Sequence, residues 1–220
     1  MNIKKSHLSN QEITRIVNRD IDPGKAFHLF QHWQNCRKCY DKIKGQKINN
    51  PIYKKSISQK FENYRCQIGL KEFHFDIMFS NEGIRRIQFI NDQDIKLKDN
   101  NDCSASIIKN FRKHFETYLN QIPEPFNKID PSLIITKFQK EVLFWTSLIP
   151  YGSSVNYGKI GKWMNKNCAQ AVGQALNKNP LPIIIPCHRV IGKDGSLTGF
   201  ASGVKLKKKL LEIEKSNRNH

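Results

Sequence analysis

Hydrophobic and polar residues first mark out a short helical region near the N-terminus. Residues 11–19 and 25–40 have the spacing of helices, and the turn signal Asp22-Pro23-Gly24 separates them. Residues 45–53 are polar and contain Asn49-Asn50-Pro51, which predicts a loop.

The pattern then changes to that of a small sheet. Apolar residues alternate or run continuously through 64–70, 72–79 and 84–90, and residues 80–83 form a turn signal. These segments predict antiparallel strands joined by hairpins. Residues 104–119 follow with apolar side chains at helical spacing, which predicts an amphipathic helix.

The rest of the chain is predicted to be mainly helical. Helices are expected over 138–149, 157–164, 168–177 and 206–214. The second and third are short and joined by a tight connection, which favours a helix-turn-helix. The predicted fold class is therefore α+β.

A proline-rich stretch suggests where the domains divide. Residues 122–131 contain too many prolines for a helix or a strand. The predicted organisation has four parts: an N-terminal extension of unknown role at 1–60, an α/β domain at 61–131, a helical domain at 132–214 and a basic tail at 215–220.

The charge balance narrows the choice of partner. Lysine and arginine number 37 against 19 acidic residues, a formal net charge of +18. This excess favours nucleic acid as a partner, although a solvated basic surface is the alternative. Apolar runs are too short to span a membrane, and Met1–Asn10 lacks the apolar core of a signal peptide. Six cysteines without a regular framework predict reduced intracellular thiols.

The segment Pro186-Cys187-His188-Arg189 carries the clearest chemistry. A nearby imidazole and guanidinium favour the reactive thiolate over the thiol, whose ordinary pKa is about 8.5. A small buried hydrophobic residue is the alternative role for Cys187. The apolar run before it suggests an extended segment, in which Cys187 and His188 point to opposite faces. Proton transfer between them then needs a bend or a bridging water.

A second group of side chains suggests a metal. Four side chains that bind zinc in other proteins share one face of the predicted helix at 25–40: His28, His32, Cys36 and Cys39. One straight helix cannot wrap them around one ion, because the outer pair lie about 16 Å apart at 1.5 Å per residue. A structural zinc site needs some of them plus ligands from elsewhere, such as Cys66 or His74. A polar helix face is the alternative.

Residues 186–190 resemble the active-site signature of the 6-O-alkylguanine-DNA alkyltransferases, also called methylated-DNA–protein-cysteine methyltransferases. Further segments resemble motifs of that family in the same order, at 149–158, 171–180, 197–203 and 207–214. The resemblance extends from about Phe138 to Glu214.

The resemblance implies a fold and an activity. The N-terminal domain would be ribonuclease H-like, and the C-terminal domain would be a winged helix-turn-helix. A monomer would flip an alkylated guanine out of double-stranded DNA and take its 6-O-alkyl group irreversibly, without a cofactor. The location would be intracellular: cytoplasmic in a prokaryote and nuclear in a eukaryote.

The resemblance also assigns catalytic roles. Cys187 would be the nucleophile, His188 would take its proton through a water, and Glu214 would stabilise the charged histidine. Tyr157 would lie beside the phosphate of the flipped nucleotide and is the candidate proton donor to guanine. In the last helix Leu206, Leu210 and Ile213 mark the buried face, with Glu214 at its edge.

The remaining motifs would form the DNA surface and the base pocket. The expected DNA-binding residues are Gln170, Ala171, Gly173, Gln174, Asn177 and Arg189. The expected pocket and structural residues are Asn179, Pro182, Val190, Phe200, Ala201 and Ser202. Small outward side chains favour the minor groove, and the alternative is a major-groove reader using Gln170 and Gln174. Family members usually carry an arginine where this chain has Gln170.

Other functions stay open at this point. The chain could be a non-catalytic relative that only binds lesions, a helix-turn-helix regulator that senses redox state through Cys187, or a cysteine hydrolase. Labelled methylated DNA separates them, because only an alkyltransferase acquires stoichiometric label.

Overall fold

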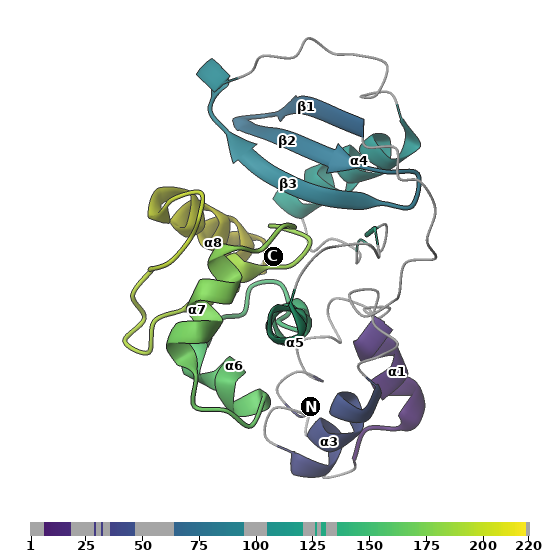
Figure 1. The fold of residues 1–220 in the computed structure, drawn as a ribbon, viewed down its shortest axis with the longest axis vertical. Coiled ribbons are helices and arrows are strands. Elements are labelled where there is room, and N and C mark those ends of the chain that lie inside the picture. The colour runs from purple at the N-terminus through teal and green to yellow at the C-terminus, as the bar shows by residue number, and fades with distance from the viewer. Residues whose placement is uncertain are drawn as a thin grey trace.

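The computed structural model describes residues 7–18, 29, 32, 36–46, 64–94, 105–120, 126, 129–130 and 136–218. Along the long axis of the molecule, a small sheet with one helix lies at one end, a group of helices in the middle and two short helices at the other end (Figure 1). In the part of the chain that is described, no helix is both long enough and apolar enough to cross a membrane.

The N-terminal helices are α1 (Asn10–Asn18) and α3 (Arg37–Gln46). Helix α1 begins at a capping box, in which the amide of Glu12 donates to Ser9 Oγ (3.2 Å) and the amide of Ser9 to Glu12 Oε2 (2.8 Å). The prediction for α1 is thus confirmed. Most of the helix predicted at 25–40 lies outside the described residues, and α3 continues into the stretch predicted to be a loop at 45–53.

The predicted sheet is confirmed. Strands β1 (Tyr64–Leu70), β2 (Phe73–Phe79) and β3 (Ile84–Ile90) are antiparallel in the order β1-β2-β3, and the short 3-10 helix η3 (Asp92–Asp94) follows. Leu70 pairs with Phe73 across a two-residue turn. The predicted turn at 80–83 lies between β2 and β3, where the chain reverses.

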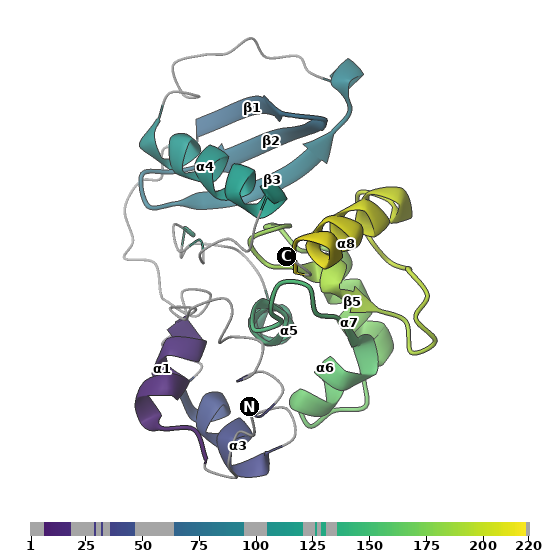
Figure 2. The same ribbon diagram turned by 180° about the vertical axis from the view of Figure 1, so that it is seen from behind.

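Helix α4 (Ser106–Asn120) covers one face of this sheet, as the two opposite views show (Figures 1 and 2). The Phe75 ring of β2 meets Phe111 and Phe115 edge-on, with centroids 5.4 and 4.7 Å apart. This aromatic packing fixes the orientation of α4 on the sheet. Tyr118, near the end of α4, is buried toward the C-terminal helices.

The sheet is also joined to the C-terminal half through its backbone. The amide of Ile87 in β3 donates to the carbonyl of Pro180 (2.8 Å). Edge strands need partners for their outward amides. Here Pro180, which precedes the Cys187 segment in the chain, provides one.

The C-terminal half is built around α5 (Lys137–Ser147), whose residues Val142 to Ser147 are all buried. Around it lie α6 (Tyr157–Trp163), α7 (Ala169–Asn177) and α8 (Val204–Arg218). The two-residue strands β4 (Val155–Asn156) and β5 (Val190–Ile191) pair in parallel. Helix α8 reaches Arg218, so the stretch predicted to be a tail at 215–220 begins inside a helix.

The prediction of an extended segment before Cys187 is wrong. Turns replace it: the amide of Ile185 donates to Leu181 (2.8 Å) and the amide of Cys187 to Ile185 (2.8 Å). Ile183 has a φ of 72°, a left-handed conformation that β-branched residues rarely adopt. Residues Cys187–Arg189 then form a 3-10 helix, η5.

The prediction that all the cysteines are reduced is also wrong. Cys66 in β1 is disulfide-bonded, whereas Cys36, Cys39, Cys168 and Cys187 are free thiols. Spacing along the chain does not reveal which sulfur atoms meet once the chain is folded.

Candidate active site

Cys187 is the first residue of η5, and only 7% of its surface is exposed. Its Sγ accepts a hydrogen bond from Asn179 Nδ2 (3.0 Å), which also donates to the carbonyl of Ile185 (2.9 Å). The amide of Leu181 donates to Asn179 Oδ1 (3.0 Å). Asn179 thus clamps the turns before Cys187 and holds the sulfur in one position.

The resting thiol is harder to ionise than the sequence predicted. Burial raises the pKa of Cys187, while the hydrogen bond from Asn179 and the charge of Lys207 act in the opposite direction. Burial dominates because the sulfur is almost completely removed from water. The expectation of a lowered pKa is therefore wrong for the free protein, and the thiol needs a base.

His188 is placed to be that base. Its side chain is fully buried, and its Nε2 lies 2.6 Å from Glu214 Oε1. Burial lowers the pKa of His188, which favours the neutral imidazole. Because the carboxylate only accepts, Nε2 carries the proton and the lone pair lies on Nδ1. Among the described residues, nothing bonds to Nδ1, although it is buried.

Glu214 is an ionised carboxylate in a fully buried place. It accepts from Arg189 Nε (2.9 Å), the amide of Gly152 (2.9 Å) and the Tyr118 hydroxyl (2.9 Å), besides His188. Burial alone would raise the pKa of Glu214, but the charges of Arg189 and His188 lower it to about 2. Arg189 has the greater effect at neutral pH, because its charge is permanent.

The structure directs Arg189 inward. Its Nη1 donates to the carbonyl of Ile149 (2.6 Å), its other nitrogens bind Glu214, and 8% of the residue is exposed. The family resemblance implied a DNA-binding role for Arg189. Because its donors already have buried partners, Arg189 is not part of the DNA surface that we propose.

Lys207 belongs to the same site, although sequence reasoning gave it no role. Its Nζ donates to the carbonyls of Val190 (2.6 Å) and Thr198 (2.9 Å) and lies 3.4 Å from the Tyr157 hydroxyl. Burial lowers the pKa of Lys207 to about 8, and the neighbouring Cys187 opposes that shift. The available signal was its spacing, since Lys207, Leu210 and Glu214 form the buried stripe of α8.

Tyr157, the first residue of α6, faces the loop at 197–203. Its hydroxyl donates to the carbonyl of Thr198 (2.7 Å), and burial raises its pKa. Gly199 has a φ of 69°, and a Cβ there would lie 3.1 Å from this hydroxyl. A glycine at this position therefore lets the loop approach Tyr157.

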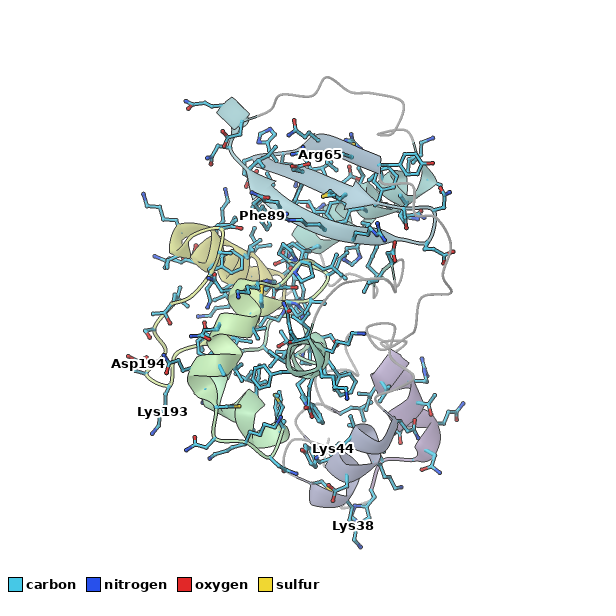
Figure 3. All side chains as sticks on the ribbon, in the orientation of Figure 1. Lys38, Lys44, Arg65, Phe89, Lys193 and Asp194 are labelled. Carbon is cyan, nitrogen blue, oxygen red and sulfur yellow. The ribbon has the colours of Figure 1, made fainter. Side chains whose placement is uncertain are left out.

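Helix α7 presents the predicted DNA-binding side chains outward or at its margin. Gln170, Gln174 and Asn177 are exposed, and Ala171 and Gly173 are half-buried. Exposed lysines stand in the segments on either side of this helix along the chain, at positions 162, 166, 178 and 193. Lys193 points outward from the loop beside α7 (Figure 3). The face is small and polar at its centre and basic at its margin.

The predicted pocket residues divide into two groups. Pro182 and Val190 are buried, whereas Phe200 and Ser202 are half-buried and Ala201 is exposed. Only Phe200, Ala201 and Ser202, on the loop at 197–203, have surface that a nucleobase could contact.

Part of the predicted metal cluster comes together in the structure. Ligand atoms of His32, Cys36 and Cys39 lie close to one another, and His7 joins them. His28 lies outside the described residues. Neither Cys66 nor His74 belongs to this cluster, and His7 was not among the predicted ligands.

The C-terminal half is similar to a known family of proteins. Residues 137–216 match the family described as "6-O-methylguanine DNA methyltransferase, DNA binding domain". The methylated-DNA–protein-cysteine methyltransferase of Methanosarcina acetivorans is 52% identical over 84 residues, which is 37% of this chain and 53% of that protein. The chain thus spans about half the length of that relative.

Other relatives match over more of their length. The methylated-DNA–protein-cysteine methyltransferase of Methanosarcina mazei is 39% identical over 142 residues, covering 62% of this chain and 87% of that protein. The crystal structure of Mycobacterium tuberculosis OGT in complex with DNA superimposes with a TM-score of 0.57 at 28% identity, covering 69% of this chain and 92% of that one. This chain belongs to the family of methylated-DNA–protein-cysteine methyltransferases.

Proposed function

We propose that this protein repairs DNA by direct reversal, moving a methyl or other alkyl group from the 6-oxygen of guanine to Cys187. One observation carries the proposal. A buried thiol clamped by Asn179 is followed in the chain by a neutral imidazole whose Nε2 is 2.6 Å from an ionised Glu214. Together they supply a fixed nucleophile, a base and a stabiliser of the charged base.

In this mechanism the proton leaves first. His188 Nδ1 takes the proton of Cys187 through a bridging water, and Glu214 stabilises the resulting imidazolium. The thiolate then attacks the alkyl carbon. A carbon–sulfur bond forms, the carbon–oxygen bond breaks, and its electron pair stays with guanine.

Tyr157 would assist the departure of guanine by protonating it. Its hydroxyl is within 3.4 Å of Lys207 Nζ, so the ammonium is available to replace the lost proton. The product is a thioether, which no side chain of the site can cleave. Each molecule therefore acts once and needs no cofactor.

DNA is the substrate, and α7 would enter its minor groove. Small residues Ala171 and Gly173 permit close approach, and the lysines around α7 would contact phosphates. The target base must rotate out of the duplex, at a cost of a few kcal/mol that is smaller for a damaged base. A major-groove mode would instead place Gln170 and Gln174 on adenine edges.

Finer assignments of the fold belong to the same proposal. We assign the sheet with α4 to a ribonuclease H-like domain at 61–131 and the C-terminal helices with β4 and β5 to a winged helix-turn-helix at 132–214. The protein would act as a monomer and in the compartment that holds the DNA, either prokaryotic cytoplasm or a eukaryotic nucleus.

The test uses duplex DNA carrying a labelled 6-O-methylguanine. We expect label to move to protein in a one-to-one ratio, with peptide mapping placing it on Cys187. Cys187→Ala should abolish transfer, whereas Cys168→Ala, which removes another free thiol, should leave it intact. Tight lesion binding without label would favour the non-catalytic relative, and transfer by Cys187→Ala would overturn the assignment of the nucleophile.

A further inference from the structure

A cluster of four side chains near the N-terminus has no part in the proposed alkyl transfer. The His2Cys2 cluster consists of His7, His32, Cys36 and Cys39, whose ligand atoms all lie within 4.8 Å of one another. It lies outside the matched family segment at 137–216 and in the chain before the sheet. We propose that this cluster is a structural zinc site that fastens the N-terminal helices to the DNA-binding half.

The spacing of the ligand atoms fits a tetrahedron. His7 Nδ1 lies 3.3 Å from Cys36 Sγ and 4.0 Å from Cys39 Sγ, and His32 Nε2 lies 3.3 Å from Cys39 Sγ. A tetrahedral zinc with bonds of about 2.3 Å to sulfur and about 2.0 Å to nitrogen holds its ligands about 3.3–3.8 Å apart. The side chains thus need only small shifts to surround an ion.

The types of ligand select the metal and its role. Two sulfurs and two imidazoles exclude calcium and magnesium, which take oxygen ligands, and are typical of zinc. Four protein ligands complete the coordination and leave no position for a reacting water. The site is therefore structural rather than catalytic.

The surroundings favour bound thiolates. The amide of Leu8 donates to Cys39 Sγ (3.1 Å), the kind of outer contact that orients a metal-bound sulfur. Cys36 directly precedes α3, and its carbonyl accepts from the amide of Tyr40 (3.0 Å). Both cysteines thus lie at the positive end of the α3 dipole, which stabilises negative charge.

A metal would stabilise the fold of this region, because its hydrophobic core is small. Its described core is limited to a few side chains of α1, α3 and the residue before α1, namely Leu8, Ile13, Ile16, Val17, Cys39, Tyr40 and Ile43. Units with so little apolar core usually need a disulfide or a metal to stay folded. Cys36 and Cys39 are free thiols, so the cross-link that the geometry offers is a metal.

The metal would act on the DNA-binding half through Tyr40, the neighbour of Cys39. The Tyr40 ring stacks on Trp145 of α5, with centroids 5.3 Å apart and an angle of 8° between the rings. Its hydroxyl donates to the carbonyl of Trp163, the last residue of α6. Fixing the start of α3 therefore fixes a contact with both the central helix and the first helix of the helix-turn-helix.

The test measures metal directly in the full-length protein. We expect one zinc per chain after purification without chelators, by elemental analysis and by release to a chromogenic chelator. Cobalt in its place should give the absorption bands of a tetrahedral thiolate complex. Cys39→Ser should lose the zinc and the sulfur-to-cobalt band, whereas Cys168→Ser, a free cysteine outside the cluster, should keep both.

A second variant keeps the proposal testable if Cys39→Ser does not fold. His7→Cys replaces one ligand by another, so it should keep the zinc and strengthen the sulfur-to-cobalt band. Protein that is folded but metal-free after zinc supplementation would overturn the proposal. So would a Cys36–Cys39 disulfide in protein prepared with zinc under reducing conditions, which would assign the pair to redox chemistry. These readouts do not depend on alkyl transfer.

Discussion

The hydroxyl of Tyr118, in α4, donates a 2.9 Å hydrogen bond to Glu214 Oε1, 96 residues later in α8. The same oxygen of Tyr118 lies 3.3 Å from His188 Nε2. A side chain from the helix that covers the N-terminal sheet thus helps to place the Glu214 carboxylate and the His188 imidazole of the C-terminal half. Because Tyr118 acts through His188 and Glu214, we regard it as a positioning residue.

Tyr118→Phe should slow alkyl transfer while leaving the protein folded. The variant keeps the ring but removes the donor to Glu214, and a hydrogen bond to a charged group contributes about 1.5–3 kcal/mol to stability. Glu214 then interacts more strongly with His188, which raises the pKa of the imidazole. The acid limb of the rate profile should therefore move to higher pH, a shift that a loss of packing alone does not cause.

Rates measured by transfer of label at a series of pH values check this. The control is Tyr64→Phe, the same change in β1, where the ring stacks on Phe79 with centroids 5.4 Å apart. If both variants lose stability alike and neither shifts the pH profile, Tyr118 only fills space.

Glu214 should make the free energy of unfolding depend on pH in the acid range. The pKa of its carboxyl falls from an ordinary 4.5 to about 2 in the folded protein. A group whose folded pKa is lowered stabilises the protein above its unfolded pKa and loses that effect as pH falls. Glu214 should therefore contribute about 3 kcal/mol above pH 4.5, declining toward pH 2.

Urea unfolding at a series of pH values measures this contribution. Glu214→Gln should be less stable at neutral pH and lose less stability on acidification than the wild type. Glu212→Gln is the matched control, because Glu212 is exposed on the same helix and only 3.8 Å from Lys208. Equal pH dependence in wild type and Glu214→Gln would contradict the lowered pKa.

Lys207→Met should slow the reaction of Cys187 with a free base analogue such as benzylguanine. The ammonium charge of Lys207 lowers the pKa of Cys187, so its removal should leave less thiolate at a given pH. Because the pKa of Lys207 is about 8, its charge disappears as pH rises through that value. The ratio of wild-type to variant rates should therefore be greatest below pH 8 and shrink above it.

The free base is used because it removes contacts with DNA phosphates from the comparison. Lys208→Met changes an exposed neighbour and should react at the wild-type rate. A rate ratio for Lys207→Met that stays constant across pH would mean that the lysine acts through packing rather than charge.

Sequence patterns predicted the elements that bury one face. The strands of the sheet, α4 and α7 were found because apolar residues recur at periods of two or 3.6 and turn residues interrupt them. The motif around Cys187 identified the chemistry for the same reason, since its residues are neighbours in the chain. Features formed by residues that are close in the chain can thus be predicted from the sequence.

Contacts between distant segments could not be predicted in this way. Tyr118 has the spacing of a core residue, and nothing in α4 indicates that its hydroxyl reaches Glu214. His7 is separated from Cys36 by 29 positions, so only folding reveals it as a fourth ligand. Ile183 takes a left-handed conformation that its own side chain disfavours, because the surrounding turns impose it.

The identity of residue 170 should control how well the flipped state is held. Gln170 is exposed at the start of α7, where the family resemblance places an arginine that fills the gap left by the rotated nucleotide. A neutral amide loses the charge-assisted hydrogen bond to the orphaned base, which contributes about 1.5–3 kcal/mol against roughly 1 for a neutral one. We therefore expect slow repair of duplex DNA but an ordinary reaction with free benzylguanine, provided that the pocket admits it.

Gln170→Arg should accelerate duplex repair by about five- to tenfold, the equivalent of roughly 1 kcal/mol, and leave the free-base rate unchanged. The two rates separate base flipping from chemistry, because the pocket around Cys187 is built from other segments. Gln174→Arg adds the same charge one turn later on the exposed face of α7, so it measures the effect of charge alone. That effect should fade with salt, since it arises from contacts with phosphates. An advantage of Gln170→Arg over Gln174→Arg that persists at high salt would assign residue 170 to the base stack. Slower duplex repair by Gln170→Arg, or an equal change in both of its reactions, would mean that another residue fills the gap.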